Sequence, residues 1–245
     1  MRSTTNKKQN GTNKTKKGTN KTKTPSIILG SNCRTNKKLL KYINDVINKK
    51  FRVNDVTQKV NISVIITAKY GFKHKSRSEL WKEMLIKCKK YAYAEKLNAN
   101  LEYIDCSRKA NLDKFKNSIK KNDIILILGG DTFYLMYYLQ KYKLDKMICN
   151  KIKNNKKKAA LLIGCCAGAI ISGKSIHPTH IARFNKRSKK YNYNFKKKYF
   201  SKKENMRGLN IIKKNFLPHC TSKNKSFVLK KQKIYCLPEL KPYIQ

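Results

Sequence analysis

Short apolar runs alternate with longer amphipathic stretches along most of this chain. Each apolar run is rich in Ile, Leu or Val and ends near a glycine or a polar residue, which is typical of a buried strand. Five such runs predict strands: Ser26–Gly30, Ile62–Ala68, Leu101–Cys106, Asp123–Gly130 and Ala159–Gly164.

The stretches between these runs carry apolar residues at helical spacing, with lysines on the other positions. They predict helices around 39–47, at Leu80–Leu97, at Asn111–Lys120, from about Thr132, at Asp145–Asn154 and at Ala167–Gly173. Alternating strands and helices predict an α/β fold, a three-layer sandwich with a mainly parallel central sheet. In such sheets the chemistry lies at the carboxyl ends of the strands.

The N-terminal end of this pattern and one internal segment differ from the rest. Residues 1–24 are polar and basic, repeat GTNKTK, and are expected to form a disordered tail. Residues 25–245 are expected to form a single α/β hydrolase-type domain. A basic, Tyr- and Phe-rich insertion interrupts that domain at about 185–205, before strand-like patterns resume at Leu209–Cys220 and Lys233–Leu240.

The formal net charge of the 245-residue chain is +46. One interpretation is attraction to nucleic acid or another polyanion, and the other is compositional drift, because the lysines are scattered among many Asn and Ile residues. The chain has no apolar run of about 18 residues and no apolar segment near its N-terminus, so we expect a cytoplasmic protein without a membrane span. Its eight cysteines form no CxxC pair, which favours reduced thiols over a disulfide framework or a metal site.

The strongest chemical signal is Gly164-Cys165-Cys166-Ala167-Gly168, at a predicted strand-to-helix junction. It fits a G-x-nucleophile-x-G turn with cysteine in the place where serine is usual. In this hypothesis Cys166 is an exposed nucleophile, and the side chain of Cys165 points away from it and packs in the interior. The alternative is a junction of small residues that lets the strand and the helix approach closely.

A nucleophile needs a base, and His219 at the end of a predicted strand is the first candidate, with His180 as the reserve. A histidine in such a place can also be purely structural. Glu204 is the candidate acid, because no Asp or Glu occurs between Asp145 and Glu204.

The second glycine-bearing strand end is Gly129-Gly130-Asp131-Thr132. The backbone N–H of Gly130 is a candidate oxyanion donor together with that of Ala167. Asp131 and Thr132 are candidate substrate-binding residues, or else simply cap the following helix.

Several motifs together resemble the dipeptidase E family of aspartyl dipeptidase-like serine peptidases. ILILGGDTFYLMYYL is similar to its GGGNTFxLL segment, GCCAGA to its G-x-S-A-G-A elbow, and GLNIIKKNFLPHC to the stretch with its Pro-His. The resemblance implies a flavodoxin-like, class I glutamine amidotransferase-like fold and a hydrolase of small peptides that needs no metal or cofactor. It also implies Cys166 in place of the nucleophilic serine, although Ile181 stands near the position of the family's acid.

The sequence therefore supports two main hypotheses. The first is a peptidase or amidohydrolase with a cysteine nucleophile, whose small peptide substrates could include dipeptides with an N-terminal Asp. The alternative is an inactive family member that binds nucleic acid or another polyanion through its basic insertion and tail. A redox sensor or glyoxalase-like enzyme is a third reading. The oligomeric state is not predicted.

Overall fold

A computed structural model describes residues 26–32, 37–51, 59–71, 76–80, 82, 99–154, 160–177, 196–220, 234–237 and 242–245. The predicted tail at 1–24, most of the predicted helix Leu80–Leu97 and most of the insertion lie outside these residues.

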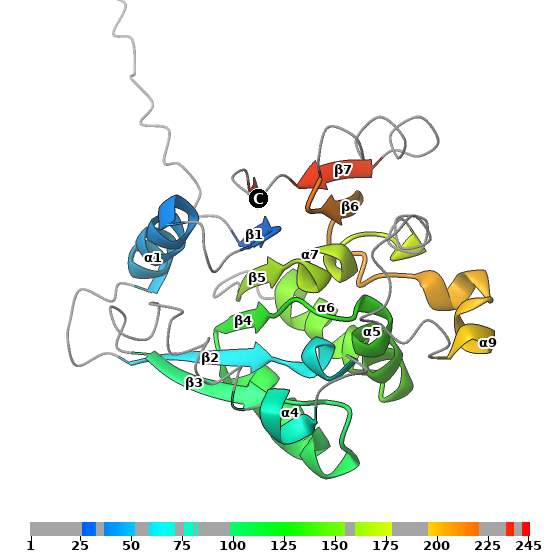
Figure 1. The fold of residues 1–245 in the computed structure, drawn as a ribbon. Coiled ribbons are helices and arrows are strands. Elements are labelled where there is room, and N and C mark those ends of the chain that lie inside the picture. The colour runs from blue at the N-terminus through cyan, green and yellow to red at the C-terminus, as the bar shows by residue number, and fades with distance from the viewer. Residues whose placement is uncertain are drawn as a thin grey trace, which may run out of the picture.

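The centre of the fold is a six-stranded sheet with the strand order β3-β2-β4-β5-β1-β8 (Figure 1). Its neighbouring strands are parallel except for β8, which runs antiparallel to β1. The strand bounds are β1 Ile27–Gly30, β2 Val60–Ile65, β3 Ala99–Ile104, β4 Ile124–Ile127, β5 Leu161–Cys165 and β8 Tyr243–Ile244.

Helices cover both faces of this sheet, and side chains within one strand divide between two cores. Ile125 and Ile127 of β4 face a core shared with α4 (Leu112–Lys121), α5 (Thr132–Lys141), α6 (Leu144–Asn154) and α7 (Ala167–Ser172). Ile124 and Leu126 face a second core on the side of α1 (Lys37–Phe51). The predicted three-layer α/β sandwich with a mainly parallel sheet is thereby confirmed.

Most predicted elements agree with the structure to within a few residues, and the differences occur mainly where strands end. The apolar run Ile62–Ala68 leaves the sheet at Ile65 and continues as the 3₁₀ helix η1 (Thr67–Gly71). A second 3₁₀ helix, η2 (Lys109–Asn111), precedes α4.

The predicted strand Leu209–Cys220 is much shorter in the structure. Only β6 (Asn215–Pro218) is a strand, and it pairs in parallel with β7 (Ile234–Leu237) in a separate two-stranded sheet. The preceding residues 209–212 donate backbone hydrogen bonds to the last turn of α7 and to Gly173, for example from Leu209 N–H to the Ile171 carbonyl at 2.6 Å. Buried Leu209 and Ile212 thus line a loop, which a run of apolar residues does not distinguish from a strand.

One pair of cysteines departs from the expectation of reduced thiols. Cys220, two residues after β6, forms a disulfide with Cys236 in β7. The pairing register explains the contact, because Leu217 lies beside Cys236 and the chain turns back after Pro218. The scattered sequence positions of the cysteines carry no signal of this register.

Two short helical pieces, α9 (Lys197–Phe200) and η4 (Lys203–Met206), form the end of the insertion and pack beside α5 (Figure 1). None of the helices in the described ranges is long and apolar enough to cross a membrane.

Candidate active site

Cys166 lies at the turn from β5 into α7, in a backbone conformation that non-glycine residues rarely adopt. Its φ is 49° and its ψ is −103°. Its N–H donates to the Gly30 carbonyl at the end of β1 (2.9 Å), and its carbonyl accepts from the N–H of Ile170 (3.0 Å). The hydrogen bonds with Gly30 and Ile170 thus hold the strained turn in place, as expected of a nucleophile elbow.

The two adjacent thiols differ in their surroundings, as the sequence predicted. Cys165 is buried at 4% exposure in the core on the α1 side, whereas Cys166 is half-buried. Only the second thiol therefore combines the strained backbone with access to solvent.

The end of β4 lies directly beside the elbow. A Cβ atom built on Gly129 would lie 2.8 Å from Cβ of Cys166, too close for two carbon atoms, so this approach of the two segments requires glycine. The next residue, Gly130, has a φ of 146°, which favours glycine as well.

The two backbone groups expected to bind an oxyanion lie at this junction. Gly130 follows the strand end that contacts Cys166, and Ala167 begins α7 immediately after it. The first N–H groups of a helix have no partner within the helix, so the N–H of Ala167 is available to a bound group. The placement of both donors is compatible with an oxyanion hole.

Asp131 has a structural task. It is 1% exposed, and its Oδ1 accepts hydrogen bonds from the N–H groups of Phe133 (2.8 Å) and Tyr134 (3.0 Å) at the start of α5. Thr132 is equally buried. The expectation that Asp131 caps the helix is confirmed, and burial leaves neither side chain open to a substrate.

His219 follows β6 directly and is exposed, with a φ of 57°. Its N–H donates to Oγ of Ser31 (3.0 Å), and Ser31 in turn donates to the carbonyl of Leu237 in β7. Gly30 and Ser31 are consecutive residues, and they hold the backbones of Cys166 and His219 respectively. The structure therefore brings the predicted nucleophile and the predicted base to the same end of β1.

Ser31 was not singled out in the sequence, although it is the residue that positions His219. It is 2% exposed and joins β1 to both strands of the small sheet. A serine directly after a strand-ending glycine was the only available signal, and such a pair is common in turns.

Glu204 does not join this group. It is exposed in η4. The next residue, Asn205, ties η4 to the C-terminal end of α5, because its carbonyl accepts a hydrogen bond from Nε2 of Gln140 (3.3 Å). The carbonyl of Met206 accepts from the N–H of Ile176 (2.9 Å), just beyond α7. Cys166 and Asp131 lie at the opposite ends of those two helices, so the geometry does not support Glu204 as the catalytic acid. His180, the reserve base, lies outside the described residues.

A further polar cluster, which the sequence did not indicate, lies at the carboxyl end of β3. The guanidinium of Arg77 forms an ion pair with Asp105 (2.5 Å), donates to Oγ of Ser107, and lies 4.5 Å from the ring centroid of Tyr70. Burial, followed by the nearby Asp105 carboxylate, raises the pKa of the Tyr70 hydroxyl. Arg77 is thus a cation held at the end of β3, at the same edge of the sheet as the elbow. In the sheet, β2 and β4 lie between β3 and β5, the strand that leads into the elbow.

The basic insertion contributes two described aromatic residues, and both pack inward. The hydroxyl of Tyr199 donates to Oε1 of Gln140 (2.8 Å), and Phe200 is 5% exposed against Phe133. These two rings are therefore not presented for base stacking. The remaining aromatic residues of the insertion, Tyr191, Tyr193 and Phe195, lie outside the described residues.

Among the described residues, no group of three or more His, Cys, Asp or Glu side chains could hold a metal ion.

A thiol on a strand-to-helix elbow, at the carboxyl edge of a parallel sheet, defines an α/β protein of the nucleophile-elbow class. A model of peptidase family S51 matches residues 76–235, which is more than half of the chain. The chain therefore belongs to peptidase family S51, as the motifs predicted.

Curated relatives match over shorter segments. An uncharacterised peptidase of Listeria monocytogenes is 30% identical over 125 residues, covering 51% of this chain and 53% of the relative. One from Listeria innocua is 35% identical over 82 residues, covering 34% and 37%. Peptidase E of Shewanella sp. (strain ANA-3) is 42% identical over 65 residues, covering 26% of each. The matches thus span between about a quarter and about half of these relatives.

Solved structures show the same fold over most of the chain. A Listeria monocytogenes EGD-e crystal structure named for peptidase E has a TM-score of 0.60 at 20% identity, covering 89% of this chain and 93% of that one. A peptidase from an acI-B1 Actinobacterium has a TM-score of 0.58 at 17% identity, covering 89% and 82%.

Proposed function

We propose that this protein is a peptidase of small peptides that uses Cys166 as its nucleophile and His219 as its general base. The observation that carries the proposal is the strained backbone of Cys166, held by Gly30 one residue away from the serine that holds His219. Membership of peptidase family S51 supports peptide-bond hydrolysis as the reaction.

The first step is attack of the Cys166 sulfur on the carbonyl carbon of the scissile amide, while His219 accepts the thiol proton. The negative charge that develops on the carbonyl oxygen is stabilised by the N–H groups of Gly130 and Ala167. Collapse of this tetrahedral intermediate breaks the carbon–nitrogen bond, and His219 returns the proton to the departing amine.

The second step is hydrolysis of the thioester. His219 takes a proton from water, the resulting hydroxide attacks the acyl carbon, and the Cys166 sulfur leaves with the proton restored. A cysteine thiol is far more acidic than a serine hydroxyl, so a Cys–His pair works without the carboxylate that a serine nucleophile needs. This accounts for a site to which Glu204 does not contribute.

The proposed substrates are short peptides with an N-terminal Asp. The resemblance to dipeptidase E motifs and the peptidase E relatives support this choice, and the net charge of the chain favours acidic substrates. Arg77 at the carboxyl edge is a candidate partner for the substrate carboxylate, because its charge is only partly exposed and is held in place by Asp105.

The test combines alkylation with hydrolysis of Asp-Leu and Leu-Leu dipeptides. We expect iodoacetamide to abolish hydrolysis in step with modification of Cys166, mapped by mass spectrometry. Cys166→Ala should lower kcat/KM by about 10⁴-fold or more, as for loss of a nucleophile in related mechanisms. The neighbouring Cys165→Ser is the matched control, because it changes an adjacent thiol that packs in the core.

Cys166→Ser separates peptidase chemistry from other thiol chemistry. The hydrolysis that this variant retains should be much slower, because a serine nucleophile needs a carboxylate that Glu204 does not supply, and it should be insensitive to iodoacetamide. If Cys166→Ala hydrolyses both dipeptides as fast as the unmodified protein, or if only Cys165 reacts, the nucleophile assignment is wrong. His219→Ala should slow alkylation of Cys166 below pH ~7, and unchanged alkylation would remove His219 from the mechanism.

A further inference from the structure

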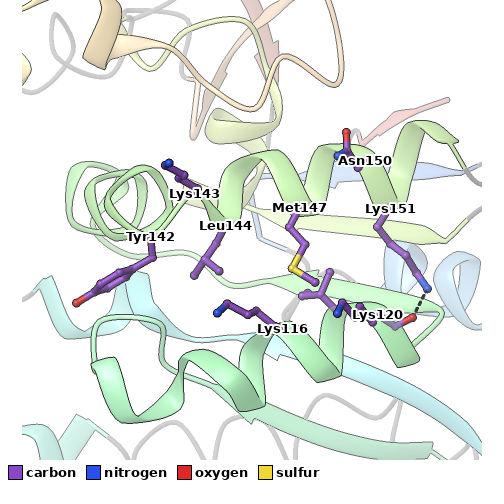
Figure 2. A pocket seen from close by; sticks show the side chains of 9 residues that line it. Lys116, Lys120, Tyr142, Lys143, Leu144, Met147, Asn150 and Lys151 are labelled. Atoms are coloured by element: carbon purple, nitrogen blue, oxygen red, sulfur yellow. Dashed lines mark hydrogen bonds between the residues drawn. The ribbon is translucent and has the colours of Figure 1, made fainter.

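A groove of about 760 Å³ lies between α4 and α6, away from the nucleophile elbow (Figure 2). Three apolar side chains form its floor: Ile119 from α4, and Leu144 and Met147 from α6. Ile119 and Leu144 belong to the main core and are almost fully buried, whereas Met147 is only partly buried. The floor is therefore a part of the core that a partner can reach from outside.

Four lysines surround this floor. Lys116 and Lys120 lie one turn apart on α4, Lys143 precedes α6, and Lys151 lies near the end of α6. Lys116 has a partial counter-charge in Asp113 at 3.4 Å, and Lys151 donates to the Lys120 carbonyl at 2.8 Å. Figure 2 shows Lys143 at one end of the groove and Lys151 at the other, with the apolar side chains between them.

The spacing of these positive charges matches that of negative charges on a suitable partner helix. Residues 144–151 span about 10 Å along α6 at a rise of about 1.5 Å per residue. A helix with two carboxylates seven residues apart covers the same length, and apolar side chains three and four residues after the first carboxylate fall between them on the same face. Such a helix matches both the cationic ends and the apolar middle of the groove.

Neither the N-terminal residues 1–24 nor the helices of the described ranges offer a complementary acidic segment. Residues 1–24 contain no Asp or Glu. No helix in the described ranges has a net negative charge, so a second copy of the chain would bring lysines to lysines. A nucleic acid would find a single aromatic ring, Tyr142, beside an otherwise aliphatic floor, which does not provide for the stacking of successive bases. The occupant is therefore a different, acidic protein.

We infer that the groove between α4 and α6 binds an acidic amphipathic helix of a partner protein. Acidic side chains of that helix pair with Lys143 and Lys151 at the two ends, and its leucine- or methionine-like side chains cover Met147. This interaction is independent of the peptidase reaction, because none of the groove residues belongs to the elbow or to its hydrogen-bond partners.

The probe is a fluorescein-labelled 15-residue helical peptide with two Glu seven residues apart and two Leu between them, added to the full chain and followed by anisotropy. A scrambled peptide of the same composition has the same charge without the amphipathic face. We expect saturable binding of the ordered peptide, at least about 10-fold tighter than that of the scrambled one.

Two variants of the protein test the groove itself. Charge reversal at Lys143→Glu and Lys151→Glu should weaken binding by at least about 10-fold. The pair Lys41→Glu and Lys49→Glu on α1 is the matched control, because both lysines are exposed, the change in net charge is the same, and α1 covers the opposite face of the sheet. Met147→Gln should weaken binding several-fold by removing apolar contact at nearly constant volume.

Three outcomes would overturn the inference. The first is equal binding of the ordered and scrambled peptides, and the second is equal loss of affinity in the two charge-reversed pairs. Each would mean general attraction to a basic chain. The third is no binding of the ordered peptide at 1 mM, a concentration at which helix-in-groove contacts of about −4 kcal/mol are half saturated.

Discussion

At the scale of single residues, backbone conformation and burial decide which polar groups are available for chemistry. Cys166 and Cys165 are chemically identical neighbours, yet only Cys166 has the strained conformation and solvent access. Asp131 is a carboxylate at the edge where the chemistry is expected, yet its Oδ1 accepts the two hydrogen bonds that cap α5. The sequence made Cys166 and Asp131 candidates and assigned Cys165 to packing, and the local geometry agrees with the assignment of Cys165 while it leaves Asp131 to cap a helix.

Cys106 provides a residue-scale prediction of pH-dependent stability. Burial raises the pKa of this thiol from 9.0 to about 12, because the thiolate would lose its hydration. Between these two values the folded chain keeps a proton that the unfolded chain releases, so the free energy of unfolding falls as the pH rises from about 9 towards 12. The contribution of this group to the slope is up to about 1.4 kcal/mol per pH unit.

Cys106→Ser removes this titration while keeping a group that can hydrogen-bond to Thr67. Urea unfolding between pH 7 and 11 should show that the stability difference between the two proteins narrows above pH 9. Parallel stability curves over this whole range would show that Cys106 does not titrate as its burial requires.

At the scale of elements, the site depends on how closely α7 approaches the sheet. A Cβ atom built on Gly168 would lie 2.3 Å from the carbonyl oxygen and 2.9 Å from Cβ of Ile127 in β4. The helix that follows the nucleophile thus packs directly on a strand backbone. This supports the view that the small residues of the GCCAG segment serve close packing and the elbow together.

Gly168→Ala is the matching prediction. Helix propensity alone predicts a gain of about 0.5–1 kcal/mol, because alanine favours the helix. The contact with Ile127 predicts the opposite sign, a loss of about 1–3 kcal/mol, because α7 must move away from β4. Thermal and urea unfolding measure the sign directly, and a stabilised variant would contradict the close packing.

At the scale of the whole molecule, the site needs two separate sheets. Cys166 directly follows β5 of the six-stranded sheet, His219 directly follows β6 of the two-stranded one, and Ser31 connects the two sheets. The small sheet packs through Phe216 and Leu237 into the core under α7, and the Cys220–Cys236 disulfide closes it next to His219. The position of the proposed base therefore depends on contacts between segments that are far apart in the sequence.

The disulfide gives a prediction at this scale. It closes a loop with a sequence separation of 16 residues, for which the loss of chain entropy in the unfolded state is worth about 3 kcal/mol. Oxidised protein should therefore be more stable than Cys236→Ser by about that amount, and the difference should vanish in dithiothreitol.

Cys149→Ser is the control for the disulfide, because the thiol of Cys149 donates to the Leu209 carbonyl and takes no part in it. Its stability relative to the unmodified protein should be the same with and without reductant. A reductant-independent difference for Cys236→Ser would contradict the pairing.

The alternation of apolar runs and amphipathic stretches was enough to predict the α/β sandwich and most strands, and the glycine motif around Cys166 predicted a turn from strand to helix at that residue. These features are local, because neighbouring residues alone determine the apolar run of a buried strand, the periodicity of a helix and the glycines of a tight turn. Tertiary structure decided the features that the sequence did not predict: the short length of β6, the role of Ser31, the distance of Glu204 from the elbow, and the Cys220–Cys236 pair. Each depends on which distant segments meet, and the free energy of such contacts leaves no periodic pattern in a single sequence.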